Sequence, residues 1–191
     1  MNYLAHFYLS DNQSDLLVGN FIADQVKGKQ IELLPLGIAN GVRLHRFIDD
    51  FTDHHPIVKQ SKERLRKRYR KYAGVIVDIY YDHFLASLWD NFSEQNLNDF
   101  SLQVYQELEN HIHLMPEICS KLILPTMKKQ NWLCSYAELN GIERTLQGLS
   151  RRTSFYSQME YAVEELKQDY SLFLTEFNLF LPELKQAVNK L

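Results

Sequence analysis

Apolar residues recur along nearly the whole chain at spacings of three and four positions, which is the period of an amphipathic helix. No alternating run of β-branched residues is long enough to predict a strand. The pattern therefore predicts an all-α protein. We expect helices over residues 14–27, 35–53, 56–74, 75–91, 96–113, 116–128, 130–139, 141–150 and 155–190, the last of them broken before Pro182.

Residues that begin or end helices set these boundaries. Ser14 or Asp15 is suited to cap the first helix, and Gly28 is suited to end it. Pro35 and Pro56 stand where the second and third helices begin, since proline is favoured in the first turn of a helix. Gly74 separates the third helix from the fourth.

Length and composition indicate one ordered domain, a helical bundle spanning residues 1–191. The chain has 191 residues, enough for a single substantial core, and two domains are disfavoured. It is 45% hydrophobic and 24% charged, with only 7 glycines and 5 prolines, which is typical of an ordered chain with few turns.

Charge, cysteines and hydropathy exclude several classes of protein. The net charge of −3 does not suit a generally basic nucleic-acid-binding protein. Cys119 and Cys134 lack CxxC spacing, so neither a thiolate metal site nor a disulfide framework is indicated. The N-terminal segment has no basic stretch of a signal peptide, and no apolar run reaches membrane-spanning length. We therefore expect a cytoplasmic protein without membrane contact.

Three predicted helices carry polar residues on the apolar face that should be buried. In residues 35–53, for example, the apolar positions Ile38 and Val42 are continued at helical spacing by His45 and Asp49. The polar residues concerned are Asn20 and Asp24 in the first helix, His45, Asp49 and Asp53 in the second, and Asp78, Asp82 and His83 in the fourth.

Such a cluster indicates a divalent metal site, because neighbouring carboxylates are costly to bury unless a cation compensates them. Mixed oxygen and nitrogen ligands favour manganese, magnesium or iron over a structural zinc site. The alternative is that each histidine is an ordinary core residue and that Asp24 and Asp82 cap helices or pair with Arg43 or Arg46.

Four segments of the first half resemble the acyl carrier protein phosphodiesterase family, also called acyl carrier protein hydrolase. They read NYLAHFYLS at the start, LVGNFIAD at 17–24, GVRLHRFIDDFTDHHPIV at 41–58 and VIVDIYYDHFLASLW at 75–89. The likeness continues more loosely through the second half, including the region of Arg151 and Arg152.

The resemblance implies an all-helical hydrolase, distantly related to HD-domain metal-dependent phosphohydrolases. Such an enzyme removes 4′-phosphopantetheine from holo acyl carrier protein, with manganese or magnesium as the implied cofactor and iron as a further possibility. The motif aspartate of the family corresponds to Asp24. The pair Asp82-His83 stands in the reverse order of the His-Asp dyad of HD enzymes, which leaves the assignment of ligands open.

Roles for individual residues follow from the resemblance together with the chemistry of a phosphodiester. The expected metal-binding residues are Asp24, His45, Asp49, Asp78 and His83. Asp82 or Asp53 would orient an imidazole, and His6 or His55 would protonate the leaving serine oxygen. Arg43 or Arg46 would pair with the phosphate, unless these arginines simply belong to a solvated helix face.

The third predicted helix is strongly basic and is a candidate docking surface for the acidic carrier protein. Its basic residues lie between Lys59 and Lys71. A solvated face and a nucleic-acid-binding stripe are the alternatives, of which the second would be weak and sensitive to salt. The sequence does not indicate an oligomeric state.

Two other functions remain open at the level of sequence. One is an HD-type phosphohydrolase acting on a nucleotide or another small phosphodiester, for which neutralising the basic helix should leave turnover unchanged. The other is a non-catalytic helical module that binds an acidic partner and uses the histidines and aspartates only structurally.

Overall fold

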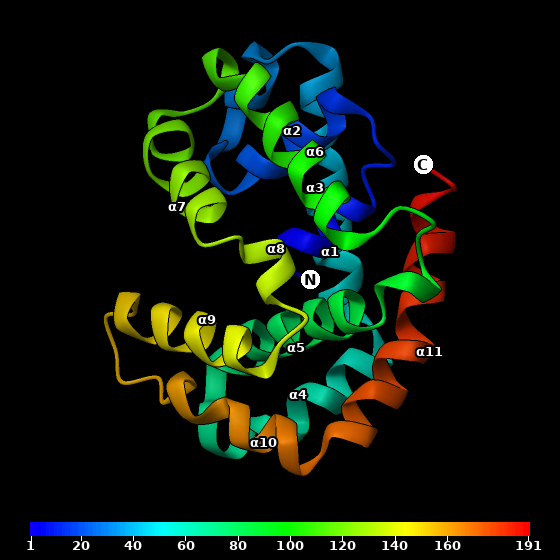
Figure 1. The fold of residues 1–191 in the computed structure, drawn as a ribbon, viewed down its shortest axis with the longest axis vertical. Helices are drawn as coiled ribbons and strands as arrows, with labels where there is room; N and C mark the ends of the chain where they lie inside the picture. The colour runs from blue at the N-terminus through cyan, green and yellow to red at the C-terminus, as the bar shows by residue number, and fades with distance from the viewer.

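The computed structural model describes residues 1–191 and consists of helices without strands, so the all-α prediction is confirmed (Figure 1). None of these helices is long and apolar enough to cross a membrane. The α-helices are α1 (Tyr3–Tyr8), α2 (Ser14–Ile22), α3 (Leu36–His54), α4 (Pro56–Tyr69), α5 (Ala73–Ser87), α6 (Leu97–Asn110), α7 (Leu124–Lys129), α8 (Trp132–Ser135), α9 (Leu139–Arg152), α10 (Ala162–Gln168) and α11 (Tyr170–Val188). Short 3-10 helices, among them η1 (Ala23–Gln25), η2 (Gly28–Leu33) and η3 (Arg70–Tyr72), and the short π-helix η6 (Cys119–Ile123) join them.

One hydrophobic core of 48 buried residues extends from Met1 to Leu184. Helix α5 lies inside it and is buried over most of its circumference, since its residues 79–86 are all buried. The aromatic rings of α5 and α11 pack edge to face, as between Tyr80 and Phe173, with ring centroids 5.0 Å apart. This core holds α5 as a fixed wall beside α1, which lies near the centre of the molecule (Figure 1).

Two glycines let the backbones of α2 and α3 touch. A Cβ at Gly19 would overlap the carbonyl oxygen of Ile38, and a Cβ at Gly41 would overlap that of Leu16. Gly19 precedes Asn20, and Gly41 lies one turn before His45. The close approach of the two helices therefore brings Asn20 within hydrogen-bond distance of His45.

Helix α1 is absent from the sequence-based expectations. It has only six residues and no side-chain cap of its own. Instead, the carboxylate of Asp82 on α5 accepts hydrogen bonds from the backbone N–H groups of Asn2, Leu4 and Ala5 at 3.1, 2.8 and 3.4 Å. A helix this short is marginal alone, so it forms because a distant carboxylate satisfies its free donors.

The first predicted helix ends earlier than expected. Helix α2 stops at Ile22 and continues as η1, which carries Asp24, whereas Gly28 adopts a φ of +52° at the start of η2. The guanidinium of Arg46 donates to the carbonyl oxygen of Val26 at 2.8 Å and so holds the chain after η1 against α3.

The predicted break before Pro182 is wrong. Helix α11 continues through this proline, and the break lies at Asp169, between α10 and α11. Pro182 and Asn178, whose carbonyl loses its helical donor, are both exposed, so water can satisfy that carbonyl. The buried rings of Phe177 and Phe180 anchor the helix on the opposite side.

Candidate metal centre

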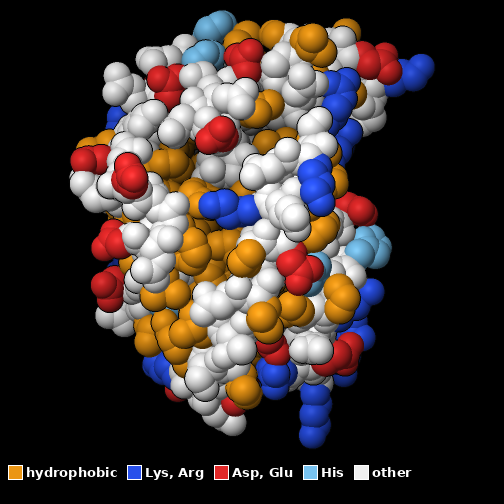
Figure 2. Space-filling model, turned by 90° about the vertical axis from the view of Figure 1, so that its right-hand side faces the viewer, with side chains coloured by type: hydrophobic (Ala, Val, Ile, Leu, Met, Phe, Trp, Pro, Cys, Tyr) orange, Lys and Arg blue, Asp and Glu red, His pale blue; other side chains and the backbone are white.

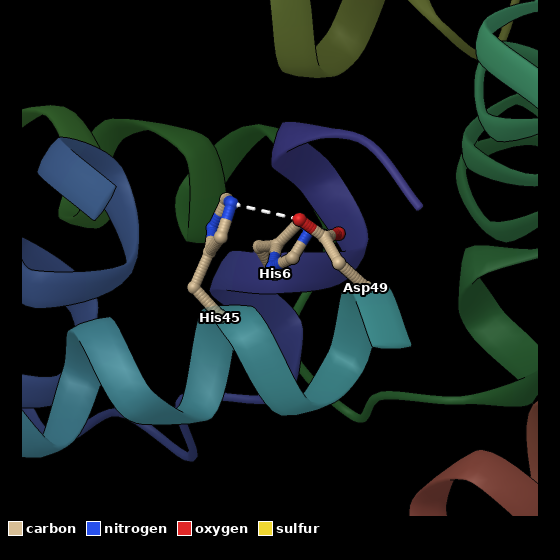
Figure 3. Close-up of side chains that lie close together, drawn as sticks. All are labelled: His6, His45 and Asp49. Carbon is tan, nitrogen blue, oxygen red and sulfur yellow. Dashed lines mark ion pairs between the residues drawn. The ribbon is translucent and has the colours of Figure 1, made fainter. Parts of the chain in front are cut away.

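Three side chains that the fold brings together form a group able to hold a metal ion. The ligand atoms of His6, His45 and Asp49 all lie within 4.8 Å of one another. His45 and Asp49 rise from the same face of α3 and meet His6 of α1 (Figure 3). We call these three residues the His–Asp cluster.

Hydrogen bonds to the side-chain oxygen of Asn20 fix the orientation of both imidazoles. The side-chain amide of Asn20 donates to the carbonyl oxygen of His6 and to Ser10 Oγ, each at 3.0 Å, so its oxygen must face the histidines. That oxygen lies 2.8 Å from Nδ1 of His6 and 3.1 Å from Nδ1 of His45. Each Nδ1 must therefore carry a proton, which leaves each neutral imidazole with its lone pair on Nε2.

Both Nε2 atoms face carboxylate oxygens. Asp49 places one oxygen 3.2 Å from Nε2 of His6 and the other 3.1 Å from Nε2 of His45, while Asp24 lies 3.4 Å from the latter atom. The two rings are stacked, with centroids 4.1 Å apart. Two imidazole Nε2 atoms and two carboxylates are thus directed at one region, which is a donor set that suits a divalent cation once Nε2 of His45 gives up its proton.

The electrostatics of the cluster also favour a cation. Burial lowers the pKa of His6 to about 4, so its ring is neutral. Burial likewise lowers the pKa of His45, but hydrogen bonds to Asp24 and Asp49 outweigh it and raise the pKa to about 9. Burial raises the pKa of Asp49, yet hydrogen bonds to His45 and His6 hold it well below its usual range. The carboxylates are therefore ionised, and a divalent ion would replace the proton on His45.

The cluster opens into a cavity of about 520 Å³. Besides the cluster and Asp24, its walls include Asp53 from α3, Asp78 and Ile79 from α5, Trp132 and Tyr136, and one face of α9. His6 is only 3% exposed, whereas the Asp24 side chain is 71% exposed. His6 is thus the most deeply buried member of this group, and Asp24 stands where a substrate could reach it.

Of the five residues expected to bind metal, the structure brings together Asp24, His45 and Asp49. Asp78 instead pairs with the amino group of Met1 at 2.8 Å. The His83 ring is occupied on both sides, by the carbonyl oxygen of Tyr136 at 2.8 Å and the hydroxyl of Tyr170 at 3.0 Å. Both ring nitrogens of His83 are therefore engaged, and neither Asp78 nor His83 belongs to the His–Asp cluster.

The remaining expected site residues lie in other surroundings. Asp82 caps α1 rather than orienting an imidazole, and Asp53 pairs with Lys62 at 2.6 Å. His55 lies 3.1 Å from Glu183 and does not line the cavity. The two arginines expected to pair with the phosphate also lie outside the cavity lining, since Arg43 bonds Asn40 on the surface and Arg46 bonds the backbone of Val26.

The structure gives two residues a place that the sequence-based reasoning did not give them. His6, expected only as a proton donor, lies in the His–Asp cluster, and Asn20, expected only as an inward polar residue, orients both rings. The amide of Asn20 on the inward side of the LVGNFIAD segment was a usable signal. For His6 there was none in the helical pattern, because α1 was not predicted.

The basic helix α4 is partly neutralised by its neighbours. Arg64 pairs with Glu176 at 2.5 Å, Arg66 with Glu63 at 2.6 Å and Arg68 with Glu165 at 2.5 Å. Its cations without an ion pair, together with those of η3, are Lys59, Lys67, Arg70 and Lys71. On the face of the molecule drawn in Figure 2, charges of both signs are interspersed.

Comparison with known proteins gives one consistent result. The family model for acyl carrier protein phosphodiesterase matches residues 1–184. A protein of that name from Photorhabdus laumondii is 33% identical over 192 residues, which cover 100% of this chain and 96% of the relative. Another from Enterobacter sp. (strain 638) is 30% identical over 194 residues, covering 100% and 99%. No solved structure matches at a significant level.

Proposed function

The chain belongs to the acyl carrier protein phosphodiesterase family, and we propose from this premise that it is a phosphoric diester hydrolase acting on holo acyl carrier protein. The bond cleaved is the phosphodiester between the serine of the carrier protein and 4′-phosphopantetheine. The products are apo carrier protein and free 4′-phosphopantetheine.

The observation that carries the proposal is the convergence of the His–Asp cluster and Asp24 in the lining of an open cavity. All four residues lie within the part of the chain that the family model matches. A phosphodiester resists hydrolysis because negative oxygens shield its phosphorus, so its cleavage needs charge neutralisation and an activated nucleophile.

The cofactor is a divalent metal, and we propose Mn²⁺, with Mg²⁺ or Fe²⁺ also compatible with two imidazoles and carboxylates. His6, His45 and Asp49 would hold the ion, with Asp24 beside them. When bound, such an ion supplies Lewis acidity and lowers the pKa of a water molecule.

The protein residues have separate tasks in this mechanism. Asn20 accepts from Nδ1 of each histidine, so that Nε2 of each ring is the atom directed at the site. Asp49 bridges the two histidines and keeps its negative charge through those contacts. Asp24 is the most accessible carboxylate of the group, and its pKa is lowered mainly by its hydrogen bond to His45, so it is ionised and able to accept the proton of the attacking water.

The carrier protein is proposed to dock on the basic surface of α4 and η3. The four cations there that make no ion pair attract an acidic partner without first breaking an internal pair, which is why they are better suited than Arg64 or Arg68. A cytoplasmic location follows from this substrate and is compatible with the two free cysteines.

Incubation of the purified protein with holo acyl carrier protein and Mn²⁺, with and without chelator, tests the proposal. Intact-mass spectrometry should show loss of the phosphopantetheine mass only when metal is available. Asp24→Ala should abolish this loss. Asp50→Ala is the matched control, because Asp50 lies one residue beyond Asp49 on the exposed side of α3 and contacts only His54.

A carrier protein of unchanged mass, with an active relative working in parallel, would contradict the proposal. Nucleotide phosphodiesters would then be the next substrates to test.

A further inference from the structure

Helix α9 supplies one wall of the cavity that also holds the His–Asp cluster. The residues of α9 on this wall are Gly141, Arg144, Thr145, Gly148, Leu149 and Arg152. Their spacing of three and four places them on a single helix face. Arg144 and Arg152 are the only lysine or arginine residues among all the residues that line the cavity.

Neither arginine is engaged with another part of the protein. No carboxylate lies within ion-pair distance of Arg144 or Arg152, and neither side chain makes a hydrogen bond, whereas Arg64, Arg66 and Arg68 are each paired with a glutamate. An arginine kept without a partner beside a cavity has its five donors free for a ligand.

The charges of the cavity explain why a ligand anion needs these two cations. Four carboxylates line it, those of Asp24, Asp49, Asp53 and Asp78. Asp53 and Asp78 are already paired with cations of the protein, and a divalent ion on the His–Asp cluster would balance Asp24 and Asp49. These groups leave no excess positive charge to bind a phosphodiester anion, and the two arginines supply that charge on a separate wall.

The space between the two arginines is open. They are eight residues apart, or about 12 Å along the helix axis. Gly148 lies midway between them, and a Cβ there would meet nothing within 4 Å. Tyr3 lies within electrostatic reach of both Arg152 and Asp24, since partial burial raises its pKa to about 12, Asp24 adds to the rise and Arg152 opposes it.

We infer that Arg144 and Arg152 form a binding wall for the phosphate anion of the substrate, opposite its contact with the metal-binding residues. The inference rests on the proposed function and names the part of the site that holds the phosphate. It transfers to α9 the role that the sequence had indicated for Arg43 or Arg46. A guanidinium fork matches two phosphate oxygens, so either arginine can bind in a bidentate manner.

Calorimetric binding of 4′-phosphopantetheine and of pantetheine, which lacks the phosphate, tests this inference on the Mn²⁺-loaded protein. Arg144→Gln and Arg152→Gln should each weaken binding of 4′-phosphopantetheine about tenfold and leave binding of pantetheine unchanged. Lysine at either position should restore part of the affinity, because it keeps the charge but not the fork.

Arg151→Gln is the matched control, since Arg151 is exposed on the same helix turn but does not line the cavity. It should bind both ligands as the wild type does. Unchanged binding of 4′-phosphopantetheine by the two cavity variants, or an equal loss in Arg151→Gln, would overturn the inference. If the two cavity variants lost affinity for apo carrier protein rather than for 4′-phosphopantetheine, the inference would also be overturned, because the arginines would then serve protein docking.

Hydrolysis by the wild type separates this inference from the proposed function. If the wild type removes phosphopantetheine from the carrier protein but Arg144→Gln and Arg152→Gln still bind 4′-phosphopantetheine normally, only the proposed role of α9 is wrong. If the wild type neither cleaves the carrier protein nor binds 4′-phosphopantetheine, both fail.

Discussion

For single residues, membership of the candidate site depends on whether the side-chain atoms are already engaged in hydrogen bonds or ion pairs elsewhere. Spacing and resemblance predicted Asp24, His45 and Asp49, which the structure brings together. They pointed equally to Asp78 and His83, which have other partners. Helical periodicity tells which side of a helix faces inward, but it does not tell which neighbour a side chain meets there.

Asn20→Ala should weaken Mn²⁺ binding by about tenfold to a hundredfold, because both imidazoles lose the acceptor that fixes their tautomers. Isothermal titration measures the affinity, and thermal unfolding shows how much of the variant is folded. Asn40→Ala is the control, since Asn40 bonds only Arg43 on the surface of the same region. A folded Asn20→Ala protein with wild-type affinity would refute this role.

His83 should make the protein less stable in acid. Burial lowers the pKa of His83 below its ordinary value of 6.5. As the pH falls below 6.5, His83 becomes protonated in the unfolded chain but stays neutral in the folded chain, so the free energy of unfolding falls by at most about 1.4 kcal/mol per pH unit. Above pH 6.5, His83 is neutral in both states and its effect on the free energy of unfolding no longer changes with pH.

Urea unfolding of the metal-free protein between pH 5 and pH 7 measures this effect. His83→Gln cannot titrate and should show a smaller decrease towards pH 5 than the wild type. Equal slopes for the two proteins would show that His83 is not held neutral in the fold.

At the scale of elements, the helices with strong periodicity were predictable, and the one that carries His6 was not. Helix α3 begins and ends within a residue of its expected bounds, because Pro35 and the 3.6-residue pattern mark it clearly. Helix α1 depends on Asp82, which lies about 80 residues away in the chain. Local sequence does not carry such a partner.

Asp82→Ala should destabilise the protein by about 1–3 kcal/mol, since it leaves buried N–H groups of α1 without an acceptor. It should also weaken Mn²⁺ binding, because α1 positions His6. Asp82→Asn keeps one acceptor oxygen, so its stability and its Mn²⁺ affinity should lie between those of the wild type and of Asp82→Ala. Thermal unfolding and metal titration measure the effects, and wild-type values for both would contradict the capping role.

The stability of the protein should also depend on the close contact between α2 and α3. Gly19→Ala should destabilise the protein by about 1–3 kcal/mol, because the new methyl group overlaps the backbone of Ile38. Gly148→Ala in α9 is the matched control and should be neutral or stabilising by up to about 1 kcal/mol, since nothing lies near its Cβ and alanine favours a helix. Denaturant unfolding of both variants compares them directly, and the same sign for both would argue against the close contact.

Across the whole molecule, the proposed sites for metal binding, phosphate binding and protein docking lie on different parts of one fold. The His–Asp cluster belongs to the helices α1 and α3, the arginine wall to α9, and the free basic charges to α4 and η3. The all-α class followed from periodicity, but the cavity did not, because it arises between segments far apart in the chain.

Cleavage of holo acyl carrier protein should depend on salt concentration, because docking of the carrier protein on the basic surface is electrostatic. Raising ionic strength should increase KM for the carrier protein and leave kcat nearly constant, because screening weakens the attraction between acidic substrate and basic surface. Replacing Lys67 and Lys71 by glutamine should reduce this dependence. A KM that does not respond to salt would place docking elsewhere.

A Mn²⁺ titration of the wild type and of His6→Gln, followed by electron paramagnetic resonance of the free ion, tests the metal centre directly. We expect the wild type to bind Mn²⁺ and His6→Gln to lose about a hundredfold or more in affinity, while Asp78→Asn keeps the wild-type affinity. Wild-type affinity in a folded His6→Gln protein, or a loss confined to Asp78→Asn, would contradict the site described.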